Sequence, residues 1–127
     1  MRFVTIWLVP ALAGCAAPPP TAPGNAPIAE LAGRVAGAPE RCVLTTQSEG
    51  FRAASQNTLL LRRGKSIWVN QLQDGCGSFG QWDVLVTEPI GTQHCAGDLV
   101  RSFDPVSNIP GPTCRLGAFI PYTRPHE

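Results

Sequence analysis

The sequence predicts an all-β domain, a small antiparallel sandwich or partly open barrel of about six strands, stapled by disulfides and preceded by a disordered Pro/Ala-rich tether. Three observations predict this class. Short β-prone runs alternate with turn residues, and no stretch predicts a helix of useful length. Cys42, Cys76, Cys95 and Cys114 supply an even set of cysteines for bridges in a small exported domain.

The clearest structural signal is a hairpin of residues 57–62 and 65–73 around the turn 63–64. Leu60 then faces Ile67, and apolar side chains occupy both faces of the hairpin. Because neither face suits water, such a hairpin belongs in the interior of a sandwich or barrel.

Further β-prone runs are bounded by turn residues, namely 42–46, 82–87, 99–103 and 114–122. In the second of these, Trp82, Val84 and Val86 share one face by the two-residue period, and Leu85 lies on the other. Residues 104–113 hold three prolines and Gly111, so a loop is expected there.

The N-terminus has the pattern of a bacterial secretory signal. Arg2 precedes the apolar run 3–13, which is too short to span a membrane. The end of that run, Leu12-Ala13-Gly14-Cys15, resembles the lipobox of bacterial lipoproteins, although an ordinary signal with a chance cysteine would look similar. The resemblance implies that residues 1–14 are a signal peptide and that the thiol of Cys15 carries the lipid.

Ala16, where retention in the inner membrane calls for aspartate, implies the periplasmic face of the outer membrane if the source is Gram-negative. Residues 15–38 are rich in proline and alanine and can bury little surface, so we expect a lipidated, extended linker. The β domain then covers residues 39–124, and residues 125–127 form a loose tail.

The remaining cysteines allow three pairings, and spacing alone does not decide between them. We favour Cys42–Cys76 with Cys95–Cys114, because each bond then closes a moderate loop within a local group of strands. The alternative is a zinc site of Cys76, His94, Cys95 and Cys114, but structural zinc ligands usually come in pairs about two to four residues apart. We therefore expect no metal and no cofactor.

Charge indicates no nucleic-acid partner. From Pro39 onward, eight basic residues balance eight acidic ones. A neutral domain lacks the basic stripe that nucleic acid requires and the positive surface that docks on anionic lipid. The membrane is therefore expected as a partner only through the lipid on Cys15.

A set of short motifs follows the lipobox in a fixed order. They are Gly37-x-Pro39-x-x-Cys42, Asp74-Gly75-Cys76, Cys95-Ala96-Gly97-Asp98 and Cys114-Arg115-Leu116-Gly117-x-Phe119. Over residues 37–122 this set resembles a family of small uncharacterised proteobacterial lipoproteins with a four-cysteine domain. The resemblance implies an exported, cysteine-stapled domain and carries over no catalytic residue.

No catalytic constellation is evident in the sequence. Asp98 follows a tight turn, where an aspartate more often accepts hydrogen bonds from turn amides than acts as an acid or base. His94 is expected to be a surface histidine beside a bridge. A glycosidase-like pair of Asp83 and Asp98 is a remote alternative.

Four aromatic residues are expected in the core rather than in a sugar-binding groove. These are Trp68, Phe79, Trp82 and Tyr122. The basic cluster Arg62, Arg63 and Lys65 at the hairpin tip is expected to be a solvated turn rather than a site for anionic lipid or acidic glycans.

Together these features predict a non-enzymatic periplasmic lipoprotein, anchored in the outer membrane, that binds or supports another envelope component. The alternative is an inhibitor of an enzyme that reaches the periplasm, comparable with small lipoproteins that inhibit lysozyme. A small hydrolase is the remote alternative.

Overall fold

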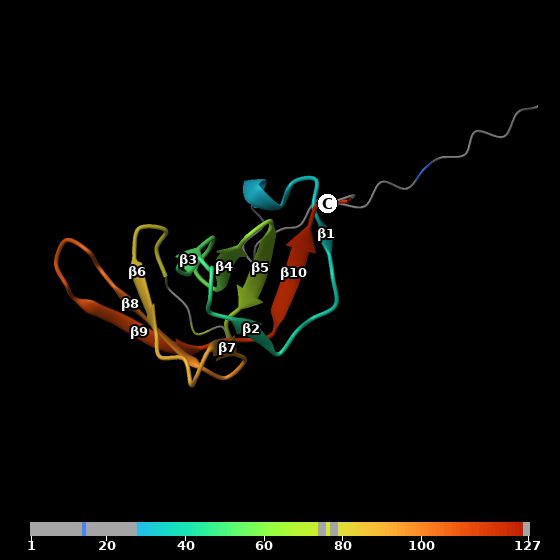
Figure 1. Ribbon diagram of the computed structural model, residues 1–127. Helices are drawn as coiled ribbons and strands as arrows, with labels where there is room; N and C mark the ends of the chain where they lie inside the picture. The colour runs from blue at the N-terminus through green and yellow to red at the C-terminus, as the bar shows by residue number, and fades with distance from the viewer. Residues whose placement is uncertain (1–13, 15–27, 74–75, 77–78, 126–127) are drawn as a thin grey trace, which may run out of the picture.

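The computed structural model describes Gly14, residues 28–73, Cys76 and residues 79–125. In that part the chain forms ten β-strands, one short 3-10 helix and no α-helix (Figure 1). The strands pair antiparallel in three sheets that do not close into a barrel, and two disulfides staple them. The predicted all-β, antiparallel, disulfide-stapled class is confirmed.

The elements follow one another as η1 (Ala29–Leu31), β1 (Val35–Ala36), β2 (Cys42–Leu44), β3 (Arg52–Ala53), β4 (Thr58–Arg63), β5 (Ser66–Gln71), β6 (Val84–Thr87), β7 (Gln93–Cys95), β8 (Leu99–Phe103), β9 (Pro110–Arg115) and β10 (Phe119–Thr123). The predicted number of about six strands is too low. Three short strands, β1, β3 and β7, lie outside the predicted runs, and the predicted strand 114–122 is divided between β9 and β10. β9 also begins inside the predicted loop 104–113.

The central sheet has the strand order β1-β10-β5-β4-β3, and the predicted hairpin is its β4–β5 pair. The turn is Gly64-Lys65 rather than 63–64, so Leu60 lies opposite Val69 and not opposite Ile67. The register therefore differs by two residues, which is one full side-chain period, and the apolar side chains keep their predicted faces. Gly64 has a φ of +58°, a left-handed conformation that glycine adopts without strain.

Both faces of the central sheet are covered. On one face, Leu59, Leu61 and Trp68 belong to the main core, which also contains Phe119 from β10 and Val100 from β8. This core fills the space between the central sheet and the strands β2, β7, β8 and β9 (Figure 1). The expectation that the hairpin lies in the interior is confirmed, and burial of these side chains is the main stabilising contribution of the fold.

The opposite face of the central sheet carries Leu60, Ile67 and Val69, and Ile28 and Leu31 cover it. Residues 28–38 therefore belong to the fold, and their assignment to a linker of residues 15–38 is wrong. Leu31, in η1, is only 1% exposed, and β1 pairs with β10. The sequence of the segment gives no sign of this, because the need for a cover arises from the hairpin that it packs against.

A separate pair of strands, β2 and β7, carries the first disulfide. Cys42 lies directly opposite Cys95 and is bonded to it, and Cys76 is bonded to Cys114. The favoured pairing is therefore wrong, because β2 pairs with a strand 53 residues further along the chain and not with a sequence neighbour. In the chain-entropy account, each bond closes a loop long enough to contribute about 4 kcal/mol.

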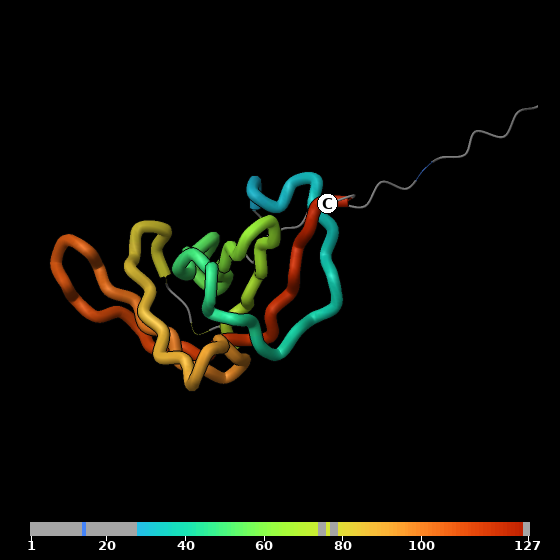
Figure 2. Tube along the Cα trace, viewed as in Figure 1, coloured from blue at the N-terminus to red at the C-terminus, as the bar shows by residue number. Residues whose placement is uncertain are grey.

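The distal sheet has the strand order β6-β8-β9. Its inner side chains Leu85, Val100 and Cys114 pack into the main core, so the second disulfide anchors β9 from inside. The β8–β9 hairpin projects at the end of the molecule opposite β1 and the C-terminal end of β10, as the chain trace shows (Figure 2).

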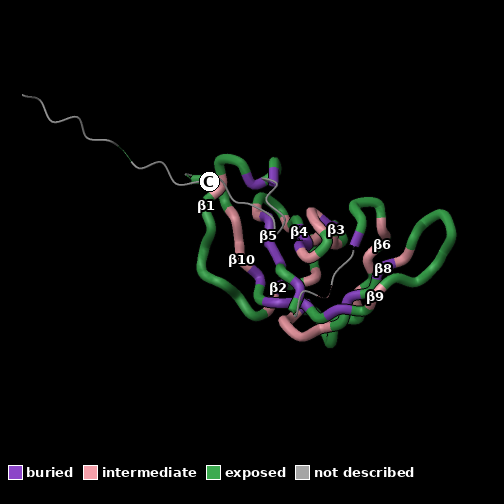
Figure 3. Tube along the Cα trace, turned by 180° about the vertical axis from the view of Figure 1, so that it is seen from behind, coloured by how far each residue is buried: buried purple, intermediate pink, exposed green. Residues whose placement is uncertain are grey.

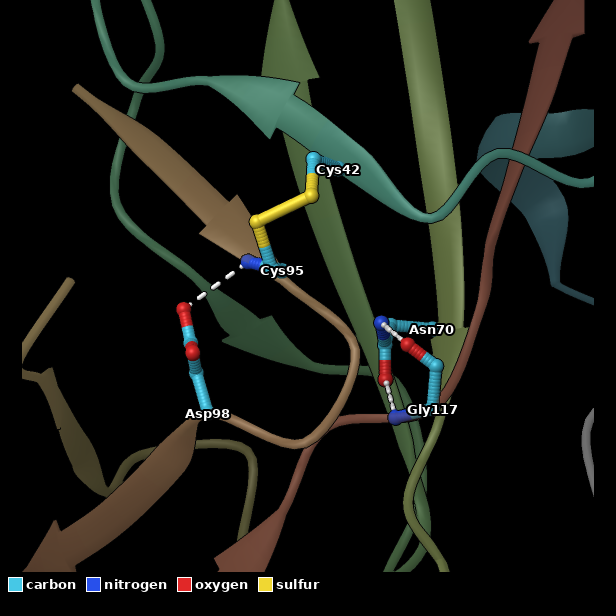
Figure 4. Close-up of a disulfide and its surroundings, with 5 residues drawn as sticks. All are labelled: Cys42, Asn70, Cys95, Asp98 and Gly117. Atoms are coloured by element: carbon cyan, nitrogen blue, oxygen red, sulfur yellow. Dashed lines mark hydrogen bonds between the residues drawn. A yellow bond between two sulfur atoms is a disulfide. The ribbon is translucent and has the colours of Figure 1, made fainter. Parts of the chain in front are cut away.

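The chain passes from the distal sheet to the central sheet through Leu116 and Gly117. The side-chain amide of Asn70, which is fully buried, accepts a hydrogen bond from the Gly117 N–H at 2.8 Å and donates one to the Gly117 carbonyl at 2.7 Å (Figure 4). A Cβ at position 117 would lie 2.1 Å from the carbonyl oxygen of Gln71, so only glycine fits here. This close approach explains why the predicted strand 114–122 is interrupted.

Several predicted features lie outside the described residues. They are Cys15, the signal peptide apart from Gly14, the linker before residue 28, Asp74-Gly75 and the last two residues.

Candidate functional site

Asp98 holds the turn between β7 and β8. One of its carboxylate oxygens accepts a hydrogen bond from the Cys95 N–H at 2.8 Å (Figure 4). Its backbone carbonyl accepts one from the Leu116 N–H at 2.9 Å, and Gly97 adopts a φ of +93° between Cys95 and Asp98. The expectation that Asp98 caps turn amides is confirmed, and the cap fixes the backbone beside the Cys42–Cys95 bridge.

His94 is buried rather than exposed. It lies on β7 opposite Val43 and is 8% exposed, because this side of the β2–β7 pair faces the main core. Its ring meets Phe51 edge-on at a centroid distance of 4.9 Å, and its Nδ1 has no hydrogen-bond partner among the described residues. Burial lowers the pKa of His94, and the nearby charge of Asp98 opposes that shift. The predicted surface histidine is therefore a buried core residue.

Asp83 caps a different turn, where its carboxylate accepts a hydrogen bond from the Gly80 N–H at 2.8 Å. It lines a surface hollow that neither Asp98 nor His94 lines, so the proposed pair of carboxylates does not share one cleft. The zinc alternative also loses its ligands, because Cys76, Cys95 and Cys114 are bonded in disulfides. Across residues 28–73, 76 and 79–125, no group of three or more His, Cys, Asp or Glu side chains is placed to hold a metal ion.

The predicted core aromatics divide into two groups. Trp68 and Phe79 are buried in the main core as expected, and the half-buried Tyr122 packs on the opposite face of the central sheet, against the cluster that contains Leu60, Ile67 and Val69. Trp82 is 80% exposed, so its assignment to the core is wrong. The reason is that Leu85 of β6 packs against the main core, so the side chains that alternate with it face solvent.

The basic hairpin tip is tied to its surroundings. The Arg63 Nε donates to the Thr46 carbonyl at 2.9 Å, and the Lys65 carbonyl accepts a bond from Arg34 at 2.7 Å. These contacts fit the expected solvated turn, and they also fix the hairpin to the segments that follow β2 and η1.

The feature that sequence reasoning missed is the outer side of the distal sheet. Val84, Val86 and Leu99 are 49%, 41% and 39% exposed, and Val84 lies opposite the half-buried Phe103 on β8. We call these four residues the distal apolar face. On β8, Val100 and Ser102 point the other way and are buried. The exposed Arg101 lies between Leu99 and Phe103 on the outer side, opposite Val86.

Exposed apolar side chains are concentrated in the stretch of chain that contains this face. Of nine large hydrophobic residues that are exposed in the described part of the chain, seven lie between residues 82 and 109. Beyond the strands they are Trp82, Ile90, Val106 and Ile109. The last two lie in the β8–β9 hairpin, and the end of this hairpin is exposed (Figure 3). Scattered exposed apolar residues are ordinary, whereas a contiguous exposed apolar patch is typical of an interaction surface.

A hollow of about 260 Å³ opens beside the same hairpin. It is lined by Asp83, Ser102, Asp104, Ser107, Ile109, Pro110, Gly111 and Pro112. The Asp104 carboxylate accepts hydrogen bonds from the N–H groups of Val106 and Ser107, at 2.8 and 3.1 Å. Hydrogen bonds from the amides of Ser107 and Val106 lower the pKa of Asp104, so a fixed negative charge stands at the rim.

Charge is divided unevenly along the chain. Residues 79–113 hold four carboxylates (Asp83, Glu88, Asp98 and Asp104) and one guanidinium (Arg101), a net charge of −3. The other described residues from 28 onward carry eight cations and three carboxylates, a net charge of +5. The sum over the whole domain hides this contrast, whereas counting charge along the chain in windows would have found it.

The comparisons with known proteins do not assign the chain to a group. No protein-family model matches it, and no curated protein or solved structure matches it significantly. Among the described residues, no helix has the length and apolar character needed to cross a membrane.

Proposed function

We propose that this protein is a lipid-anchored binding module of the bacterial envelope, held by Cys15 at the periplasmic face of the outer membrane. Its distal apolar face binds another envelope component. The observation that carries this proposal is the gathering of exposed apolar side chains on the distal sheet, away from the C-terminal end of β10. The half-buried carboxylate of Asp98 and the buried ring of His94 serve the β2–β7 region of the fold, which favours binding over catalysis.

The lipobox supports the anchoring part of the proposal, and a direct test is available. Cells expressing the wild-type chain and the Cys15→Ser variant are labelled with a palmitate analogue and fractionated. The proposal expects label and protein in the outer-membrane fraction for the wild type only. Equal membrane association of both chains, or an unlabelled wild type, contradicts it.

The binding part is tested by photocrosslinking from two matched valines. A photoreactive amino acid replaces Val86 on the distal apolar face, or Val35 on β1, which is 57% exposed at the other end of the domain. The proposal expects a discrete adduct from position 86 and none from position 35, and loss of that adduct in the Val84→Ser background. Equal adducts from both positions contradict it.

A second candidate function is inhibition of an enzyme that reaches the periplasm. The net charge of −3 over residues 79–113 favours it, because such a surface attracts a cationic enzyme. The test is the rate of a cationic lysozyme in the presence of excess protein. Inhibition by the wild type that is lost in Trp82→Ser supports this candidate, and an unchanged rate excludes it for that enzyme.

A further inference from the structure

Among the described residues, the outer edge of the distal sheet is a strand that pairs on one side only. β6 pairs with β8 alone in the described part of the chain, so alternate N–H and C=O groups of Val84–Thr87 point away from the sheet. Natural proteins usually protect such edges with proline, charge, a bulge or short length.

The other sheet edges in the described part of the chain carry one of these protections or are shorter than β6. β2 and β7, the two edges of the two-stranded sheet, have three residues each. β9 has Pro110 and Pro112, which lack N–H donors, and its pairing with β8 is irregular between Arg101 and Phe103. β1 and β3 are two residues long each. β6 has four residues, none of them proline or charged, and is therefore the edge best able to accept another strand.

The side chains of β6 suit an added strand of alternating character. Val84 and Val86 point outward, while Leu85 packs toward the main core. Apolar side chains of a neighbouring strand would lie beside the two valines and bury surface that is now exposed.

The charges around β6 select the kind of strand. Asp83 precedes β6, and Glu88 follows it with an exposed carboxylate that contacts Arg101 at 2.9 Å. An anionic lipid surface would be repelled by the net charge of −3 in this region. A second copy pairing antiparallel through β6 would bring the same carboxylates together, whereas a cationic strand would neutralise them.

We propose that the free edge of β6 binds an extended cationic peptide segment of a partner protein by strand addition, with the apolar side chains of that segment on Val84 and Val86. This rests on the proposed function and names the partner's chemistry. Backbone hydrogen bonds supply the affinity, and the alternating side chains supply the selection.

The test uses the full exported chain, purified in a non-ionic detergent, and a capped octapeptide of alternating valine and lysine. Three comparison peptides share its length. One carries N-methyl groups on its central valine and central lysine, which blocks both peptide edges. The others replace lysine by glutamate, or replace valine by glycine. Binding is measured by fluorescence anisotropy and by hydrogen exchange of the protein.

The expected result is binding of the valine–lysine peptide with slower exchange at residues 84–87, and at least tenfold weaker binding of all three comparison peptides. The double variant Asp83→Asn/Glu88→Gln weakens binding roughly fivefold. The Asp83→Asn change removes the charge and keeps a side-chain oxygen that can accept the Gly80 bond. Glu49→Gln, which removes an exposed carboxylate outside residues 79–113, leaves binding unchanged.

Equal binding of the N-methylated peptide, or protection at the β8–β9 hairpin instead of β6, overturns strand addition. Equal binding of the glutamate peptide or of phosphatidylglycerol vesicles overturns the proposal of a cationic partner. Self-association of the protein that slows exchange in β6 would show that the strand added there comes from a second copy of the chain. If no peptide binds while the photocrosslink from position 86 persists, this inference fails and the proposed function stands.

Discussion

The two larger sheets of this domain both have apolar side chains on both faces, but they differ in how many of these faces are buried. In the central sheet, the apolar residues of both faces are covered, by the main core on one side and by Ile28 and Leu31 on the other. In the distal sheet, the inner face is buried, but Val84 and Val86 on the outer face remain 49% and 41% exposed. The difference teaches that alternation alone does not reveal which apolar face folds the protein and which one is left for a partner.

The largest effect is expected from the disulfides that hold the sheets together. Removing the Cys42–Cys95 bond by a double alanine substitution should lower the free energy of unfolding by about 4 kcal/mol, because a long loop of the unfolded chain is no longer closed. Urea titration measures the loss. A change below about 1 kcal/mol would mean that the β2–β7 pair holds the sheets without its bond.

Two glycines sharpen the comparison between the sheets. Gly117→Ala should destabilise the domain by about 3 kcal/mol, because the new Cβ meets the backbone of β5. At Gly111 in the distal sheet, a Cβ would meet the Ser102 hydroxyl oxygen, which can rotate away, so Gly111→Ala should cost only about 1 kcal/mol. Thermal melts of both variants, beside Gly50→Ala as an open-space control, test this order.

These positions also show how far the sequence could predict the fold. The β4–β5 hairpin was predictable because Leu59, Leu60 and Leu61 define two apolar faces whatever the turn. The Gly117 crossing, the Cys42–Cys95 pairing and the cover by Leu31 depend on contacts between distant segments, so local pattern could not reveal them.

The candidate site was only partly predictable. Alternation placed Val84 and Val86 on one face of β6 and Leu85 on the other correctly, but Trp82 lies in the turn before β6, and the rule that apolar residues go inside assigned it wrongly to the core. Which face of a strand is buried depends on what packs against it, and here the main core packs against the face of β6 that carries Leu85.

The burial of His94 should make the stability of the domain depend on pH. Its pKa is lowered in the folded state by burial, so the unfolded chain binds the proton more readily. The contribution of His94 to the free energy of unfolding should therefore be fully present above the usual pKa near 6.5 and should be lost as the pH decreases below it. Urea titrations between pH 5 and 8 should show this slope, and His94→Phe should remove it. A slope that persists in that variant would assign the effect to another group.

The smallest effect on stability is expected on the distal apolar face. Val84→Ser and Val86→Ser should each change the free energy of unfolding by less than about 0.5 kcal/mol, because these side chains are half exposed and support no core contact. Val100→Ala, on the buried side of the same sheet, should cost about 2 kcal/mol.

The most direct measurement pairs stability and binding in the variant Val84→Ser/Val86→Ser. If the distal apolar face serves a partner and not the fold, the urea midpoint should stay near that of the wild type. Affinity for the valine–lysine peptide and the photocrosslink from a probe at position 82 should both be lost. A variant that loses stability while retaining both binding signals would contradict the central claim.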